Sequence, residues 1–156
     1  MLRIEFQIEL AGISSHLFEI DEPVTSIEID NALPVSGDMV FLFLSVQFDS
    51  EITTERLSDE LSAIQIVDVT QADLNQQIYY LGAIADLSDV SVLSLLTEKQ
   101  AIPHRIVGKN AQLEVMASVR DWNHLKEVAD AIETEHGSLE LLGSTQTDSI
   151  GFPLGG

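Results

Sequence analysis

The chain contains no cysteine among its 156 residues. This absence excludes a disulfide framework, a thiolate nucleophile and a zinc–thiolate site. Long apolar runs are also missing, because the longest run, residues 39–44, falls far short of the ~20 residues that a membrane-spanning helix needs. The N-terminal segment MLRIEFQIEL alternates polar and apolar residues, unlike the continuous apolar stretch of a signal peptide. We therefore expect a cytoplasmic protein that makes no membrane contact.

Basic residues are scarce: seven lysines and arginines stand against 26 acidic residues, for a formal net charge of −19. Repulsion among these charges strains a small fold in dilute buffer. At molar salt the Debye length falls to ~3 Å and the repulsion is largely screened. The composition therefore favours a salt-rich, halophilic cytoplasm over that of an ordinary acidic protein. It predicts that the midpoint of thermal unfolding climbs steeply from dilute buffer to molar KCl.

The same scarcity bears on nucleic acids. Affinity for DNA or RNA depends on lysines and arginines that neutralise phosphates. Here the seven basic residues are scattered through an acidic background. We expect this chain not to bind DNA or RNA directly.

What the sequence does contain is clear periodicity. Apolar residues at every second position predict strands, and apolar residues at i, i+3, i+4 and i+7 predict helices. The predicted strands are 2–10, 24–30, 39–48, 64–69, 76–81, 102–107, 111–119 and 139–142, and the predicted helices are 54–63, 91–98 and 122–136. Segment 39–48 (MVFLFLSVQF) is at first apolar on both faces, which is typical of a central strand.

The clearest of these elements is the last helix. Asp121 is a good N-cap, and Gly137 stands where a C-terminal glycine ends a helix. The residues of its predicted buried stripe are Trp122, Leu125, Val128, Ala129 and Ile132. Segments 102–107 and 111–119 are predicted to form a hairpin.

From Gln76 onward the predicted order is strand, helix, strand, strand, helix, strand, the split βαβ arrangement of ferredoxin-like folds. We therefore predict an α+β fold: a mainly antiparallel sheet with helices on one face, in a ferredoxin-like arrangement. Residues 1–142 form one compact domain in this interpretation, or two closely packed subdomains of about 1–70 and 71–142. The polar, glycine-rich residues 143–156 are typical of a linker.

No catalytic or cofactor motif is found in the sequence. It lacks G-x-G-x-x-G, G-x-x-x-x-G-K and G-x-S-x-G. His124 and His136 share a helix but lie about 18 Å apart along its axis, so they cannot share a metal ion. All four histidines, which include His16 and His104, are predicted to be surface or capping residues. We expect a protein that is not an enzyme and has no metal or cofactor.

One local concentration of positive or titratable residues lies at a helix end and on the following hairpin. Its members are Lys99, His104, Arg105 and Lys109. A small anionic ligand or an acidic partner could bind there. The alternative is that these side chains interact with the negative end of the helix dipole and with neighbouring acids.

The second half of the chain resembles a known family. The run IPHRIVGKNAQLEVMASVRDWNHLKEVADAIETEHGSLELLGSTQTDSIGFPLGG is similar to the region that precedes the DNA-binding helices of the haloarchaeal bacterio-opsin activator family. The shared features are a strand hairpin, a helix that opens near an Asp, a strand with an L-E-L-like core and a G-x-P-L-G-like link. The first half, with EFQIEL and MVFLFLSV, is similar in layout.

The resemblance implies a regulatory domain that lies N-terminal to a helix-turn-helix in a transcription regulator. The helix-turn-helix itself is absent from this chain, which ends at Gly156. We therefore expect DNA contact only through such an attached unit, together with a homodimer and an unknown small-molecule effector. The alternative is a stand-alone ferredoxin-like module that binds a small metabolite. An enzyme of unrecognised type is the third possibility.

Overall fold

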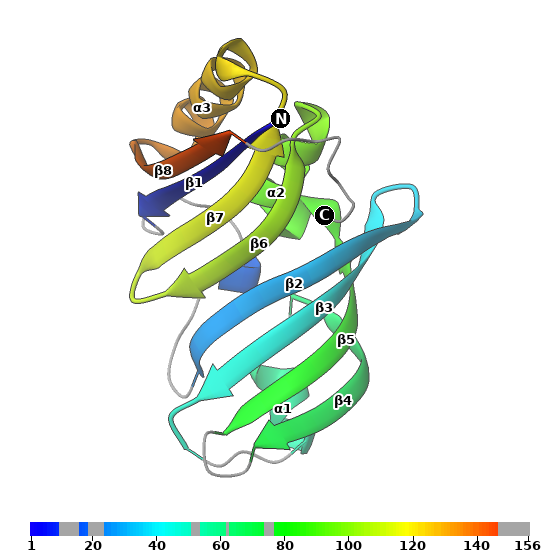
Figure 1. The fold of residues 1–156 in the computed structure, drawn as a ribbon. Helices are drawn as coiled ribbons and strands as arrows, with labels where there is room; N and C mark the ends of the chain where they lie inside the picture. Colours follow the sequence, from blue (N-terminus) through cyan, green and yellow to red (C-terminus); the bar gives the residue numbers. More distant parts are fainter. Residues whose placement is uncertain (10–15, 19–23, 51–53, 62, 74–76, 147–156) are drawn as a thin grey trace.

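A computed structural model of the chain describes residues 1–9, 16–18, 24–50, 54–61, 63–73 and 77–146. Strands dominate these residues, with three α-helices and two short 3₁₀ helices between them (Figure 1). The elements are, in chain order, β1 (Leu2–Glu9), η2 (His16–Phe18), β2 (Val24–Ser36), β3 (Met39–Phe48), α1 (Thr54–Glu60), β4 (Gln65–Asp73), β5 (Ile78–Asp86), η3 (Leu87–Asp89), α2 (Ser91–Glu98), β6 (Ile102–Lys109), β7 (Gln112–Val119), α3 (Trp122–His136) and β8 (Leu139–Gln146).

The eight strands form one sheet in the order β4-β5-β3-β2-β6-β7-β1-β8, and every neighbouring pair is antiparallel. We call β4-β5-β3-β2 the β3 half and β6-β7-β1-β8 the β7 half. The halves join where β2 pairs with β6, from Ser26 opposite Lys109 to Ile29 opposite Ile106. In Figure 1, α1 lies behind the strands of the β3 half and α2 behind those of the β7 half.

The predicted ferredoxin-like arrangement, with its helices on one face of a split βαβ unit, is wrong. That arrangement requires the strands before and after α2 to run parallel, as in any βαβ unit. In the structure β3 and β2 lie between β5 and β6, and successive antiparallel pairings make β5 and β6 run in opposite directions. Between β7 and β8 lies β1, from the start of the chain. One antiparallel sheet therefore dominates the fold. It forms because strands far apart in the sequence pair with each other, β1 with β7 and β2 with β6, and the order of elements along the chain did not predict these pairings.

The core lies on one face of the sheet. The alternation predicted for β1 is confirmed, since Leu2, Ile4, Phe6 and Ile8 are each at most 2% exposed. Two further interior strands bury one face each, with Val40, Leu42, Leu44, Val46 and Phe48 of β3, and Leu113, Val115, Ala117 and Val119 of β7. Each Å² of apolar surface that these side chains remove from water contributes about 25 cal/mol of favourable free energy, which drives the folding of the sheet.

The ends of α3 are as predicted. The Asp121 carboxylate accepts a hydrogen bond from the His124 backbone N–H at 2.8 Å, and Gly137 ends the helix with φ of +87°. Leu125, Val128 and Ile132 are buried. The prediction that Trp122 is buried is wrong, because this side chain is 55% exposed. Trp122 is the first residue of α3, which begins just after β7 ends (Figure 1), so this first turn lies at the end of the sheet.

A histidine connects α3 to α2. His124 is 1% exposed: its Nδ1 accepts from the Arg120 backbone N–H at 3.0 Å, and its Nε2 lies 2.7 Å from the Lys99 carbonyl oxygen. Because Nδ1 accepts, Nε2 carries the proton and donates to that carbonyl. The histidines are predicted to be surface or capping residues: His124 is buried but caps α2 through the Lys99 carbonyl, whereas the surface position predicted for His136 is wrong, since this residue is 5% exposed. A neutral imidazole tolerates burial when backbone groups satisfy it.

The hairpin between β6 and β7 is confirmed, with its turn at Asn110 and Ala111, both of which have positive φ.

At the C-terminal side, residues 143–146 of the predicted linker form the end of β8 at the sheet edge, and residues 147–156 lie outside the described residues. None of the helices in the described ranges is long and apolar enough to cross a membrane.

Candidate functional site

The face of the β3 half that is turned away from the core carries large apolar side chains. Leu33, Phe43 and Tyr80 are 49%, 43% and 52% exposed, and Met39 is 38% exposed. Phe41 and Ile84 are half-buried beside them. We call this set the aromatic face; its members are Leu33, Met39, Phe41, Phe43, Tyr80 and Ile84.

Strand pairing makes the aromatic face continuous. Phe41 lies opposite Leu33 of β2 on one side and opposite Ile84 of β5 on the other. The rings of Phe41 and Phe43 pack edge to face, with centroids 5.0 Å apart. Side chains at alternate positions of one strand share a face, and directly paired residues of neighbouring strands are in contact range. The set is therefore one surface and not six isolated side chains.

A glycine shapes this surface. A Cβ atom at Gly82 of β5 would lie 2.9 Å from Cζ of Phe41, closer than atoms pack. The missing side chain lets the Phe41 ring lie across the backbone of β5. The ring covers Gly82 there, while Phe43, directly opposite Gly82 in the β3–β5 pairing, stays open to solvent.

Acidic residues surround the aromatic face. Asp86 lies opposite Met39, Asp68 lies opposite Gly82, and Asp30 follows the inward Ile29 on β2. All three side chains are exposed. The strands β2, β3, β4 and β5 hold five acidic residues and no lysine or arginine. The surface therefore combines an apolar centre with a strongly negative border.

An ion-pair network marks the joint between the two halves. Arg105 of β6 donates to Glu28 of β2 at 2.9 Å, and the Ser45 hydroxyl donates to Asp30 at 2.6 Å. The hydrogen bond from Arg105 lowers the pKa of Glu28, although burial opposes this shift. Burial raises the pKa of Asp30 to about 6, and the hydrogen bond with Glu28 acts in the same direction. Asp30 is thus the carboxyl in this network that changes charge near neutral pH.

The structure separates the four residues predicted to receive an anion or a partner. Lys99 is the C-cap of α2, whereas the other three belong to β6. His104 contacts the Ser118 hydroxyl at 2.6 Å, and Arg105 is paired with Glu28. Burial, together with the positive charge of Arg3, lowers the pKa of His104. Lys109 lies four residues beyond Arg105, about 13 Å along the strand. These residues do not converge on one ligand position.

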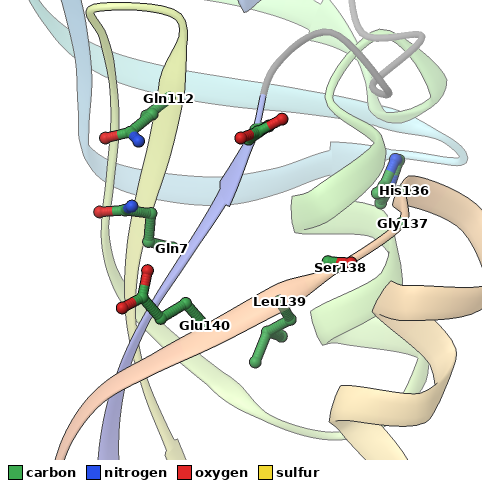
Figure 2. Close-up of a pocket in the computed structure, with 8 residues that line it drawn as sticks. Gln7, Gln112, His136, Gly137, Ser138, Leu139 and Glu140 are labelled. Atoms are coloured by element: carbon green, nitrogen blue, oxygen red, sulfur yellow. The ribbon is translucent and has the colours of Figure 1, made fainter.

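A cavity of about 440 Å³ lies in the β7 half, between β1, β7 and the turn from α3 to β8. Figure 2 shows Gln7 and Gln112 on one side of it and His136 on the other, with the two glutamines pointing away from the histidine. His136 is buried, and its Nδ1 has no hydrogen-bond partner among the described residues. Burial lowers its pKa, against the opposing charge of Glu135.

The described part of the chain contains no group of three or more His, Cys, Asp or Glu side chains placed to hold a metal ion. No model of a known protein family matches the chain, and no curated protein matches it either. Sequence reasoning missed the aromatic face. The available signal was segment 39–48, whose apolar residues on both faces were interpreted as burial on both sides of a central strand.

Proposed function

We propose that this chain is a non-catalytic regulatory and interaction domain of a haloarchaeal transcription regulator, which acts on an attached helix-turn-helix. The resemblance of residues 102–156 to the bacterio-opsin activator family supports the biological setting. The aromatic face supports the mode of action. The domain acts through contacts with other protein segments in the cytoplasm, either within a homodimer or in response to a signal.

The aromatic face carries this proposal. Scattered apolar side chains are normal on a protein surface, whereas a contiguous group marks an interaction site. Here six large apolar side chains share one open sheet face, and two of them form an aromatic pair. Aromatic side chains and methionine are also enriched at interface centres. Water contact with these groups is unfavourable, so covering them provides binding free energy.

A helix-turn-helix pair reads DNA with a half-site spacing set by the symmetry of the dimer. A domain that binds a neighbouring segment changes the geometry available to the attached DNA-binding unit. An effector shifts the equilibrium between the segment-bound and segment-free states of the domain only if its affinity for the two states differs. The β3 half offers the contact surface for such a switch.

The cavity of Figure 2 favours a second candidate function, the binding of a small metabolite. Its volume of about 440 Å³ lies in the range of small-molecule sites. The residues around it include His136, whose buried Nδ1 has no hydrogen-bond partner among the described residues. The divergent glutamines make this the weaker candidate, since ligand sites place polar groups so that they converge.

The test is a promoter-activity assay with a full-length regulator that carries this domain. We expect Phe43→Ser combined with Tyr80→Ser to change promoter output. Trp122→Ser is the matched control, because Trp122 is equally exposed but lies on α3. Normal regulation by the double variant, with protein levels equal to wild type, would contradict the proposal. Robust turnover of small metabolites by the isolated chain would favour the enzyme alternative instead.

A further inference from the structure

The charge distribution around the aromatic face restricts what can cover it. Strands β2 to β5 carry no lysine or arginine, while Asp30, Asp68 and Asp86 border the apolar centre. An occupant with acidic flanks would bring like charges together, which weakens binding wherever salt does not screen them. An occupant with basic flanks gains from the same border.

A second copy of the chain fits this surface poorly. Symmetric packing of two aromatic faces would bring together two β3 halves, each with five acidic residues and no basic residue in its four strands. A head-to-tail contact with the open side of the β7 half would meet a mixed surface, because the exposed Arg3, Arg105 and Lys109 alternate there with the exposed acids Glu5, Glu9 and Glu114. Such heterologous contacts also propagate into open chains unless the rotation closes.

An amphipathic helix matches the surface better than an added strand does. Strand addition occurs at a sheet edge, through backbone hydrogen bonds, whereas the aromatic face is the open side of strands β3 and β5, which both have neighbours on each side. Helices are the layer that covers sheet faces in α+β proteins. Lysine and arginine side chains lay their methylene stems over apolar surface and extend their charge beyond it, and they interact favourably with the faces of aromatic rings.

We propose that the aromatic face binds a basic amphipathic helix of a protein partner, whose apolar stripe covers Phe41, Phe43 and Tyr80 and whose lysines or arginines lie against Asp30, Asp68 and Asp86. This inference rests on the proposed interaction function and names the chemical class of the partner. DNA-binding helices are one source of such basic segments, since DNA affinity depends on lysine and arginine. A helix held on this face is unable to contact DNA through the same side chains.

The test uses the whole chain and synthetic peptides of about 18 residues with a leucine stripe at i, i+3, i+4 and i+7. One peptide has lysine at the polar positions, the second has glutamate, and the third is a scramble of the lysine peptide without the stripe. Calorimetry at ~0.15 M and ~1 M KCl separates screened electrostatic attraction from apolar contact. Sedimentation of the chain alone measures self-association.

We expect the lysine peptide to bind at least about tenfold more tightly than the glutamate peptide and the scramble at ~0.15 M KCl. Phe43→Ser should weaken it about tenfold or more, as expected for an aromatic at the centre of an interface. Trp122→Ser should leave the affinity unchanged. Asp68→Asn should weaken binding about twofold, whereas Glu133→Gln, an exposed carboxylate on α3, should not.

Two results would overturn the inference and leave the interaction function standing. One is equal binding of the lysine and glutamate peptides, with sensitivity to Phe43→Ser, which would show an apolar site without charge selection. The other is a dimer in sedimentation that Phe43→Ser dissociates, with no peptide bound, which would identify a second copy as the occupant. Failure of the proposed function is read separately, as normal promoter regulation by the Phe43→Ser, Tyr80→Ser regulator.

Discussion

The two halves of the sheet bury similar faces and expose different ones. The inward side chains of β3 and β7 are both continuous rows of buried aliphatic residues. On the open side, β7 and β1 present mainly polar residues such as Glu114, Gln7 and Glu5, whereas β3 presents Phe41 and Phe43. In the β7 half two helices, α2 and α3, pack against each other, while in the β3 half α1 lies beside β4.

Under the proposed function, this difference assigns stability to one face of the sheet and recognition to the other. An antiparallel sheet needs only one covered face, and the other is free to be polar. The β7 half follows that rule and has the thicker helical layer. The β3 half departs from it at six positions, and this departure is what an interaction surface requires. The following predictions test that division of roles.

The largest expected effect contrasts two adjacent residues of β3. Leu42 is fully buried and Phe43 is 43% exposed on the opposite face. Leu42→Ala should lower the free energy of unfolding by about 2–5 kcal/mol, because it leaves a cavity. Phe43→Ala should lower it by only about 0.5–1.5 kcal/mol, the size of the lost aromatic pair with Phe41. Urea denaturation monitored by circular dichroism measures both. Equal losses would mean that Phe43 belongs to the core and would remove the distinction between the faces.

The second prediction concerns the helical layer of the β7 half. His124→Ala leaves the Arg120 N–H and the Lys99 carbonyl without their partner. A buried group left unpaired costs about 1–3 kcal/mol, so we expect a loss of that size in chemical denaturation. Asn123→Ala, at the exposed neighbouring position, is the control and should stay within about 0.5 kcal/mol. Matching results for the two variants would contradict the role of His124 in joining α2 to α3.

The third prediction concerns pH at the joint of the halves. Asp30 has a pKa of about 6 in the folded state, against an ordinary value of 3.8. The folded protein therefore holds this proton more tightly than the unfolded chain, and stability falls as the pH rises from about 4 to about 6. Asp30→Asn should be more stable than wild type above pH 6 and equal to it near pH 4. Carboxyl NMR titration measures the pKa directly; a value near 4 would contradict the prediction.

The smallest expected effect is the ion pair between the halves. Arg105 and Glu28 are partly exposed, with 52% and 27% of their side chains accessible. Exposed pairs contribute roughly 0.2–1 kcal/mol and weaken with salt. A double-mutant cycle with Arg105→Ala and Glu28→Gln should give a coupling energy in that range that declines in molar KCl. A larger coupling that is insensitive to salt would show that this pair, and not the β2–β6 backbone pairing, holds the halves together.

The sequence by itself determined the local elements. Alternation predicted β1 and its buried face, and a capping Asp and a terminal Gly located both ends of α3, because these signals depend on neighbouring residues alone. Tertiary structure decided which strands became neighbours. It placed β1 beside β7 and two strands between β5 and β6, which no local pattern encodes. It also decided which apolar face of β3 stayed open, since periodicity identifies two apolar faces but only packing shows which of them is covered.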